Sequence, residues 1–169
     1  MEKKENSSRR PGYIALTSVI LAVLAAISSF QANTFSSQML FEKNSSIILQ
    51  SKANRQWNSY LADNITVHLL QNSSPTTQNK KPVAVVQTFA KEQTTFQTKA
   101  IDLEKQSDEA ANRAHVYFAK NSNMTTAGTF FDIALALTAI GTLIKRKYFL
   151  VVSLLPAIAG LYFLIIGLI

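Results

Sequence analysis

The chain has 169 residues, a net charge of +7 and no cysteine, and 47% of its residues are apolar or aromatic. The lack of cysteine excludes a disulfide framework, a thiol nucleophile and a Cys-type zinc site. The basic residues do not indicate a nucleic-acid interface, because the dense basic clusters lie directly beside apolar runs rather than on one helix face with aromatic support. Most of the apolar content falls in three runs, 13–30, 127–144 and 148–169. Each run is close to the roughly 20 residues that a helix needs to cross ~30 Å of hydrocarbon.

The chain opens on a polar tail, residues 1–12, which we expect to be cytoplasmic and which precedes a first transmembrane helix at 13–31. A charged start before an apolar run is also the layout of a cleavable secretory signal. Small residues recur every four positions at Ser18, Ala22 and Ala26, and this spacing lets membrane helices approach closely. It favours a retained span.

Two basic clusters predict the orientation in the membrane. Arg9 and Arg10 precede the first run, and Lys145, Arg146 and Lys147 separate the second and third runs. Basic residues beside short loops stay in the cytoplasm. We therefore expect transmembrane helices at 126–144 and 148–169, a cytoplasmic turn at 145–147, and an external stretch at 32–125.

The external stretch divides at 71–82, which is rich in turn-forming residues and holds Pro75 and Pro82. Both ends of the stretch are tied to the same face of the membrane, so two helical arms must run out and back. The predicted fold is an all-α membrane protein with three transmembrane helices and a long antiparallel, coiled-coil-like helical hairpin between the first and second.

The second arm carries apolar and small residues at alternating spacings of three and four, which is typical of a coiled coil. The first arm has a broken stripe of the same period, which passes through Ala53, Val67 and the doublets Met39/Leu40, Ser46/Ile47 and Tyr60/Leu61. Because many stripe positions are polar, we expect the two arms alone to pair weakly. The predicted interaction seam comprises Val86, Phe89, Phe96, Ala100, Leu103, Ala110, Ala114 and Tyr117, with Trp57 and Tyr60 from the first arm.

The pattern Ala-x-x-x-Trp-x-x-Tyr, formed by Ala53, Trp57 and Tyr60 within residues 43–62, resembles a bacterial membrane family catalogued as domain of unknown function 4337. His115 with the following Phe118, the first and second spans and the basic turn also resemble that family. The family continues after the tyrosine with Gln-Ala-Lys, whereas this chain has Leu-Ala-Asp at 61–63. The resemblance implies a bacterial inner membrane and supplies no activity.

Few residues indicate site chemistry. His68 and His115 would lie ~44 Å apart along the hairpin at helical rise, so one copy cannot use both on one metal. Asp132 lies near the external end of the second span, and two interpretations stay open: a structural carboxylate at the interface, or an ion or proton path. The acidic residues Asp102, Glu104, Asp108 and Glu109 are interpreted as a solvated side, with cation binding as the alternative. We expect no cofactor, no metal and no enzymatic activity, because the sequence has no phosphate loop or Ser/His/Asp constellation.

The leading functional hypothesis is a structural or interaction protein of the bacterial inner membrane. Its periplasmic hairpin would associate with itself, most simply as a homodimer, or bind another membrane or periplasmic protein. A sensor or ligand-binding module that signals through a separate partner, and a small channel or transport accessory, are the alternatives. The lipid bilayer is a partner in each case, and nucleic acid in none.

Overall fold

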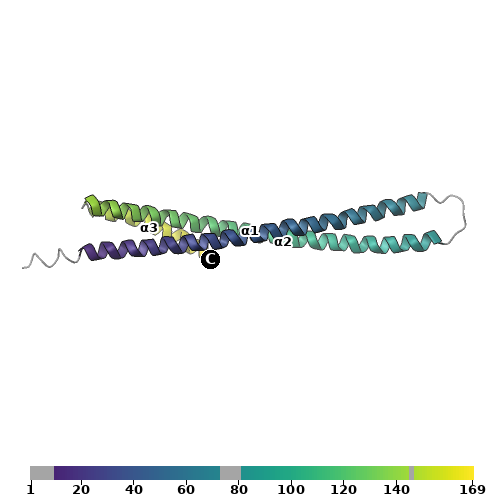
Figure 1. The fold of residues 1–169 in the computed structure, drawn as a ribbon, viewed down its shortest axis with the longest axis horizontal. Coiled ribbons are helices and arrows are strands. Elements are labelled where there is room, and N and C mark those ends of the chain that lie inside the picture. The colour runs from purple at the N-terminus through teal and green to yellow at the C-terminus, as the bar shows by residue number, and fades with distance from the viewer. Residues whose placement is uncertain (1–9, 73–80, 145–146) are drawn as a thin grey trace, which may run out of the picture. The chain divides into compact units, whose positions relative to one another are not determined.

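The computed structural model describes residues 10–72, 81–144 and 147–169, and in these ranges the fold is all-α (Figure 1). Helix α1 is Arg10–Asn72, helix α2 is Lys81–Ile144 and helix α3 is Lys147–Leu168. The all-α class is as predicted. Arg9, Lys145, Arg146 and most of the predicted turn at 71–82 lie outside the described residues.

The great length of α1 and α2 follows from where proline and glycine occur. Neither residue is present from Tyr13 to Asn72 or from Val83 to Ala127. Pro11 and Pro82 stand in the first turns of α1 and α2, where a missing backbone N–H costs no helical hydrogen bond. As a result, α1 continues unbroken beyond residue 31, the predicted end of the first span. Likewise, α2 begins well before residue 126, the predicted start of the second span.

Each helix contains an 18-residue stretch that is apolar enough to cross a membrane, with mean hydropathy of 1.9 in α1, 1.7 in α2 and 2.4 in α3. The three predicted spans therefore have helical counterparts of suitable length and composition. Pro156 lies inside α3.

The chain divides into two compact units. The first comprises residues up to Met39 together with His115–Ile169, and the second comprises Leu40–Ala114. In the first unit a small apolar core forms around Ala25, Ala127 and Phe131. Partly buried residues complete this core: Leu21, Leu24, Phe163 and Leu164.

Two buried hydroxyl groups of the first unit form hydrogen bonds within their own helices. Ser28 is fully buried and donates a hydrogen bond to the carbonyl of Leu24 at 2.9 Å. Thr138 is buried and donates to the carbonyl of Ala134 at 2.8 Å. Such bonds to the preceding turn allow hydroxyl groups in apolar surroundings without an unpaired donor.

Glycines set how closely the helices of the first unit approach. A Cβ atom added at Gly160 would lie 2.9 Å from Cε1 of Phe131 and 3.2 Å from the carbonyl oxygen of Ala127. A Cβ atom added at Gly128 would lie 3.7 Å from Ser28, an ordinary van der Waals contact. Of these two positions, only Gly160 requires a residue without a side chain.

We expect Gly160→Ala to lower the thermal stability of the protein in detergent. Overpacking costs about 1–3 kcal/mol, and the buried Phe131 ring and the backbone carbonyl cannot move aside, so this cost exceeds the gain of about 1 kcal/mol in helix propensity. Gly128→Ala is the matched control, which should leave stability unchanged or raise it. Thermal unfolding followed by circular dichroism measures both, and equal behaviour of the two variants would contradict the packing.

In the second unit, α1 and α2 contact each other in antiparallel order. Glu42 pairs with Arg113, Ser46 with Ser107 and Trp57 with Glu104, so partner numbers on α2 fall as those on α1 rise. We call the contact between the two helices in this unit the inner seam. Its buried residues are small and allow the helix axes to approach closely. They are Ala53, Ala100, Ser107, Ala110 and Ala114.

Ala53→Leu should destabilise the second unit by about 1–3 kcal/mol, because the fully buried position leaves no room for a larger side chain. Ala62→Leu is the control on the same helix, where the exposed position should change stability by less than about 0.5 kcal/mol. The free energies of unfolding in denaturant provide the comparison. Equal costs at the two positions would argue against this packing.

Candidate interaction surface

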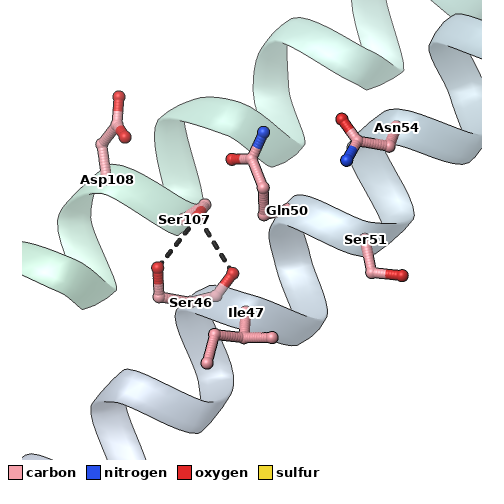
Figure 2. A pocket seen from close by; sticks show the side chains of 7 residues that line it. All are labelled: Ser46, Ile47, Gln50, Ser51, Asn54, Ser107 and Asp108. Carbon is pink, nitrogen blue, oxygen red and sulfur yellow. Dashed lines mark hydrogen bonds between the residues drawn. The ribbon is translucent and has the colours of Figure 1, made fainter.

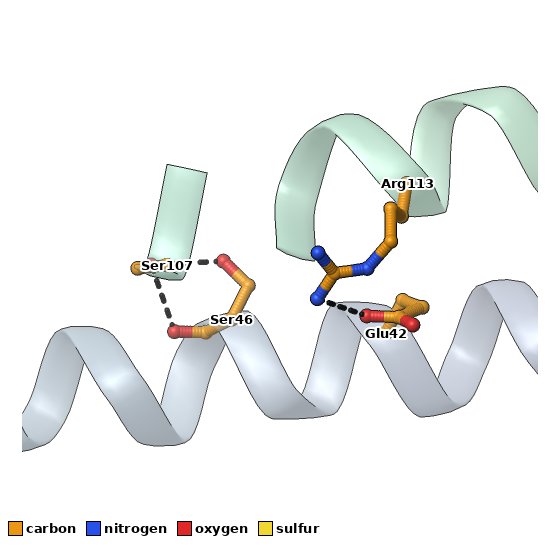
Figure 3. Close-up of polar contacts among 4 residues, drawn as sticks. All are labelled: Glu42, Ser46, Ser107 and Arg113. Atoms are coloured by element: carbon orange, nitrogen blue, oxygen red, sulfur yellow. Dashed lines mark hydrogen bonds and ion pairs between the residues drawn. The ribbon is translucent and has the colours of Figure 1, made fainter. Parts of the chain in front are cut away.

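The inner seam carries polar contacts at several levels. Ser107 Oγ donates to the carbonyl oxygen of Ser46 at 3.0 Å, which leaves the Ser46 hydroxyl to donate to Ser107 Oγ, also at 3.0 Å (Figure 3). A serine side chain is short, so a helix whose serine reaches the backbone carbonyl of a neighbouring helix must lie very close to it. At the next level, Arg113 Nη2 and Glu42 Oε2 form an ion pair at 3.1 Å, in which the Glu42 side chain is only 16% exposed (Figure 3).

The tryptophan anchors another part of the inner seam. Trp57 Nε1 donates to Glu104 Oε1 at 2.7 Å, and its ring meets Tyr60 edge-on with ring centroids 5.7 Å apart. The geometry corrects the interpretation of Glu104 as part of a solvated acidic side, because this carboxylate is half-buried and accepts from the indole. Its neighbours Asp102, Asp108 and Glu109 are exposed.

Removing the Glu104 carboxylate should cost about 1–2 kcal/mol, because a half-buried indole N–H would lose its charged partner. Glu104→Ala tests this expectation, and Glu109→Ala is the exposed control on the same helix. Trp57 is the single tryptophan of the chain, so its fluorescence reports both unfolding and the local change. If the two variants unfold at the same denaturant concentration, the hydrogen bond contributes nothing to stability.

The predicted interaction seam maps largely onto the inner seam. Ala100, Ala110 and Ala114 are buried, and the aromatic and leucine members of the second unit are partly buried: Trp57, Tyr60, Phe89, Phe96 and Leu103. Tyr117 belongs to the first unit and stacks on Phe35 with ring centroids 6.3 Å apart. The side chain of Val86 lies outside what the structure describes.

Unpaired polar atoms also lie in the second unit. Oε1 of Gln56, Oδ2 of Asp63 and Nε2 of Gln93 are buried and make no hydrogen bond with a described residue. Buried polar groups without partners oppose folding. The buried residues of the inner seam are small, four alanines and a serine, so the two helices meet at close approach rather than around large buried side chains.

A groove opens beside the serine pair, with a volume of about 460 Å³ (Figure 2). Helix α1 contributes Ser46, Ile47, Gln50, Ser51 and Asn54, and helix α2 contributes Ser107 and Asp108. All of these residues except Asp108 are uncharged. The groove therefore joins the polar centre of the inner seam to the exposed side of α1.

The exposed side of α1 in the second unit is apolar at both ends. We call it the outer face, and its core positions alternate four and three residues apart: Leu40, Asn44, Ile47, Ser51, Asn54, Asn58, Leu61 and Ile65. None of these residues is charged. Large apolar side chains on or beside the outer face are 52–72% exposed: Leu40, Phe41, Ile47, Ile48, Leu61, Ile65 and Leu69.

Helix α2 presents a different surface in the second unit. Ile101 is its one exposed large apolar residue among those that the structure describes there. Its exposed positions are otherwise mostly polar, and the charged ones are Lys91, Glu92, Lys99, Asp102, Lys105, Asp108, Glu109 and Arg113. The asymmetry between the two helices was not predicted. In the sequence, the doublets Met39/Leu40, Ser46/Ile47 and Tyr60/Leu61 indicate this difference between the helices. In each doublet the first residue is partly buried and the second is exposed.

The remaining predicted residues lie apart from this surface. Asp132 is exposed on α2 in the first unit, so one copy does not enclose it in a relay. Arg10 and Lys147 are the first residues of α1 and α3. His68 and His115 are exposed, and within the described ranges no three acidic or histidine side chains gather as a metal site would need.

A family model described as a domain of unknown function (DUF4337) matches residues 10–169. The chain belongs to this family. The predicted family is thereby confirmed, and the match extends through α3. Searches of curated proteins and of solved structures each find no match.

Proposed function

We propose that this member of the DUF4337 family is a non-catalytic interaction protein of the bacterial inner membrane. The three helices span the bilayer, and residues 40–114 form a periplasmic helical hairpin through which the chain associates with itself or with a partner. Its N-terminus is cytoplasmic, as the basic residues around Arg10 and Lys147 favour.

The exposed apolar side chains of the outer face carry this proposal. Soluble surfaces rarely gather large apolar residues in one place unless the patch binds something. Seven such side chains lie along α1 in the second unit, whereas on the described part of α2 in that unit Ile101 is the one exposed large apolar side chain. A hairpin whose exposed large apolar side chains lie almost entirely on α1 has an evident side for association.

The weak inner seam supports the same function. The buried residues of this seam are alanine and serine, and three buried polar atoms of the second unit make no hydrogen bond with a described residue, which opposes stable pairing of the two arms. A partner that binds the folded hairpin and not the unfolded chain would stabilise the hairpin by mass action. Association would therefore serve stability as well as recognition.

The full-length chain in mild detergent should be larger than its monomer mass of 18.7 kDa when crosslinked or measured by light scattering. Two differently tagged copies expressed together should also purify together, whereas copies mixed after solubilisation control for association within micelles. A monodisperse monomer without co-purification would contradict self-association. If a periplasmic or membrane protein is then crosslinked to residues 40–114 in intact cells, the partner is another chain.

A further inference from the structure

We propose that a second copy of this chain packs along the outer face of α1, parallel and in register, so that identical residues of the two copies meet. The inference rests on the proposed function, which requires association of the hairpin, and it names the surface and the partner. The predicted interaction seam is then used mainly within one copy, and the contact between copies lies on a different side of α1.

The spacing of the outer face is that of a second coiled-coil stripe. From Leu40 to Ile65 its core positions alternate four and three residues apart over 26 residues, or ~39 Å of helix. This stripe lies about 100° around α1 from the inner seam, whose members on α1 include Ser46 and Ala53. One helix thus carries two separate stripes with the same period, and α2 covers only one of them.

The charge distribution favours a second copy as the occupant. A chain with net charge +7 repels its own copy wherever basic faces meet, and the core of the outer face has no charge to repel. Its charged neighbours Lys43 and Arg55 border the stripe, where long side chains can reach solvent. The outer face of α1 therefore fits itself better than the charged surface of α2 fits it.

The order of polar and apolar layers also favours self-pairing. Apolar positions lie at both ends, with Asn44 between Leu40 and Ile47, and the three central positions are polar: Ser51, Asn54 and Asn58. Asparagine within a coiled-coil stripe pairs best with the same asparagine of a parallel neighbour and so fixes the register. A different partner would need polar residues at the same levels, whereas a second copy supplies them automatically.

Membrane anchoring imposes the parallel direction. Two copies inserted in one bilayer with the same orientation present their outer faces at the same height, so Ile47 meets Ile47 and Leu61 meets Leu61. The groove beside Ile47 and Asn54 opens at the central polar levels of the outer face, where side chains of the second copy can enter (Figure 2).

Single cysteines test the register, because the natural chain has none. Ile47→Cys, Asn54→Cys and Leu61→Cys, each in an otherwise unchanged chain in native membranes, should form a disulfide-linked dimer of twice 18.7 kDa under mild oxidation. Disulfides require Cα atoms within about 7 Å. Lys52→Cys on the same helix and Lys105→Cys on α2 are exposed controls off the outer face and should give at least tenfold less dimer.

The pattern of crosslinks decides among the outcomes. An antiparallel pair centred near Asn54 would link only that position and would overturn the parallel register. Crosslinking at Lys105 but not at Ile47 and Leu61, with tagged copies still co-purifying, would overturn the assigned surface and leave self-association standing. No dimer at any position and no co-purification would contradict self-association itself, and a product of another mass would identify a different protein as the partner.

A second variant checks that the face drives association. Ile47→Glu combined with Leu61→Glu should reduce the dimer linked through Asn54→Cys at least tenfold, because like charges would meet at both apolar levels. The exposed pair Lys52→Glu and Lys105→Glu is the matched control. Circular dichroism must show unchanged helix content in both variants, and undiminished crosslinking in the first would overturn the proposal.

Discussion

Close approach of helices through small residues is the constraint on which the second unit depends. Ala53, Ala100 and Ala110 are fully buried, and Ser107 touches both the hydroxyl and the carbonyl of Ser46. Each alanine adds little apolar area, so the contact is narrow and its stability comes from many levels rather than from a bulky core. Larger side chains, notably Trp57, lie at the edges, where a polar partner such as Glu104 is in reach.

A narrow contact has a consequence for the rest of each helix. Two helices that touch through alanine and serine cover only one stripe of each other, and every other stripe faces outward. On α2 the outward positions carry charge, which water solvates at no cost. On α1 they carry leucine, isoleucine and phenylalanine at both ends of the outer face, for which water is a poor solvent. This difference between the two helices is the basis of the proposed association through α1.

In the first unit, helices also approach closely at small residues, which there are glycines. Gly160 approaches Phe131, and Gly167 approaches Met124 at 3.0 Å from an added Cβ, so glycine on α3 receives a bulky side chain from α2. Helices in lipid gain nothing from burying apolar surface away from equally apolar tails, and close packing against small residues replaces that driving force. Hydroxyl groups such as that of Thr138 bond to the preceding turn and leave the contact surface apolar.

The sequence by itself determined the all-α class, three apolar stretches of spanning length, the family and the helical period of both arms, because each depends on local composition or spacing. It also placed Ala100, Ala110 and Ala114 on one stripe. Only the tertiary structure decided which member of the doublets Ser46/Ile47 and Tyr60/Leu61 faces α2, since neighbours in a helix differ by about 100° and either could lie inward. Likewise, Glu104 looked like any exposed acid until the fold brought Trp57 beside it from 47 residues away in the chain. Composition and period are local properties, whereas a partner across a helix pair exists only once the register of that pair is fixed.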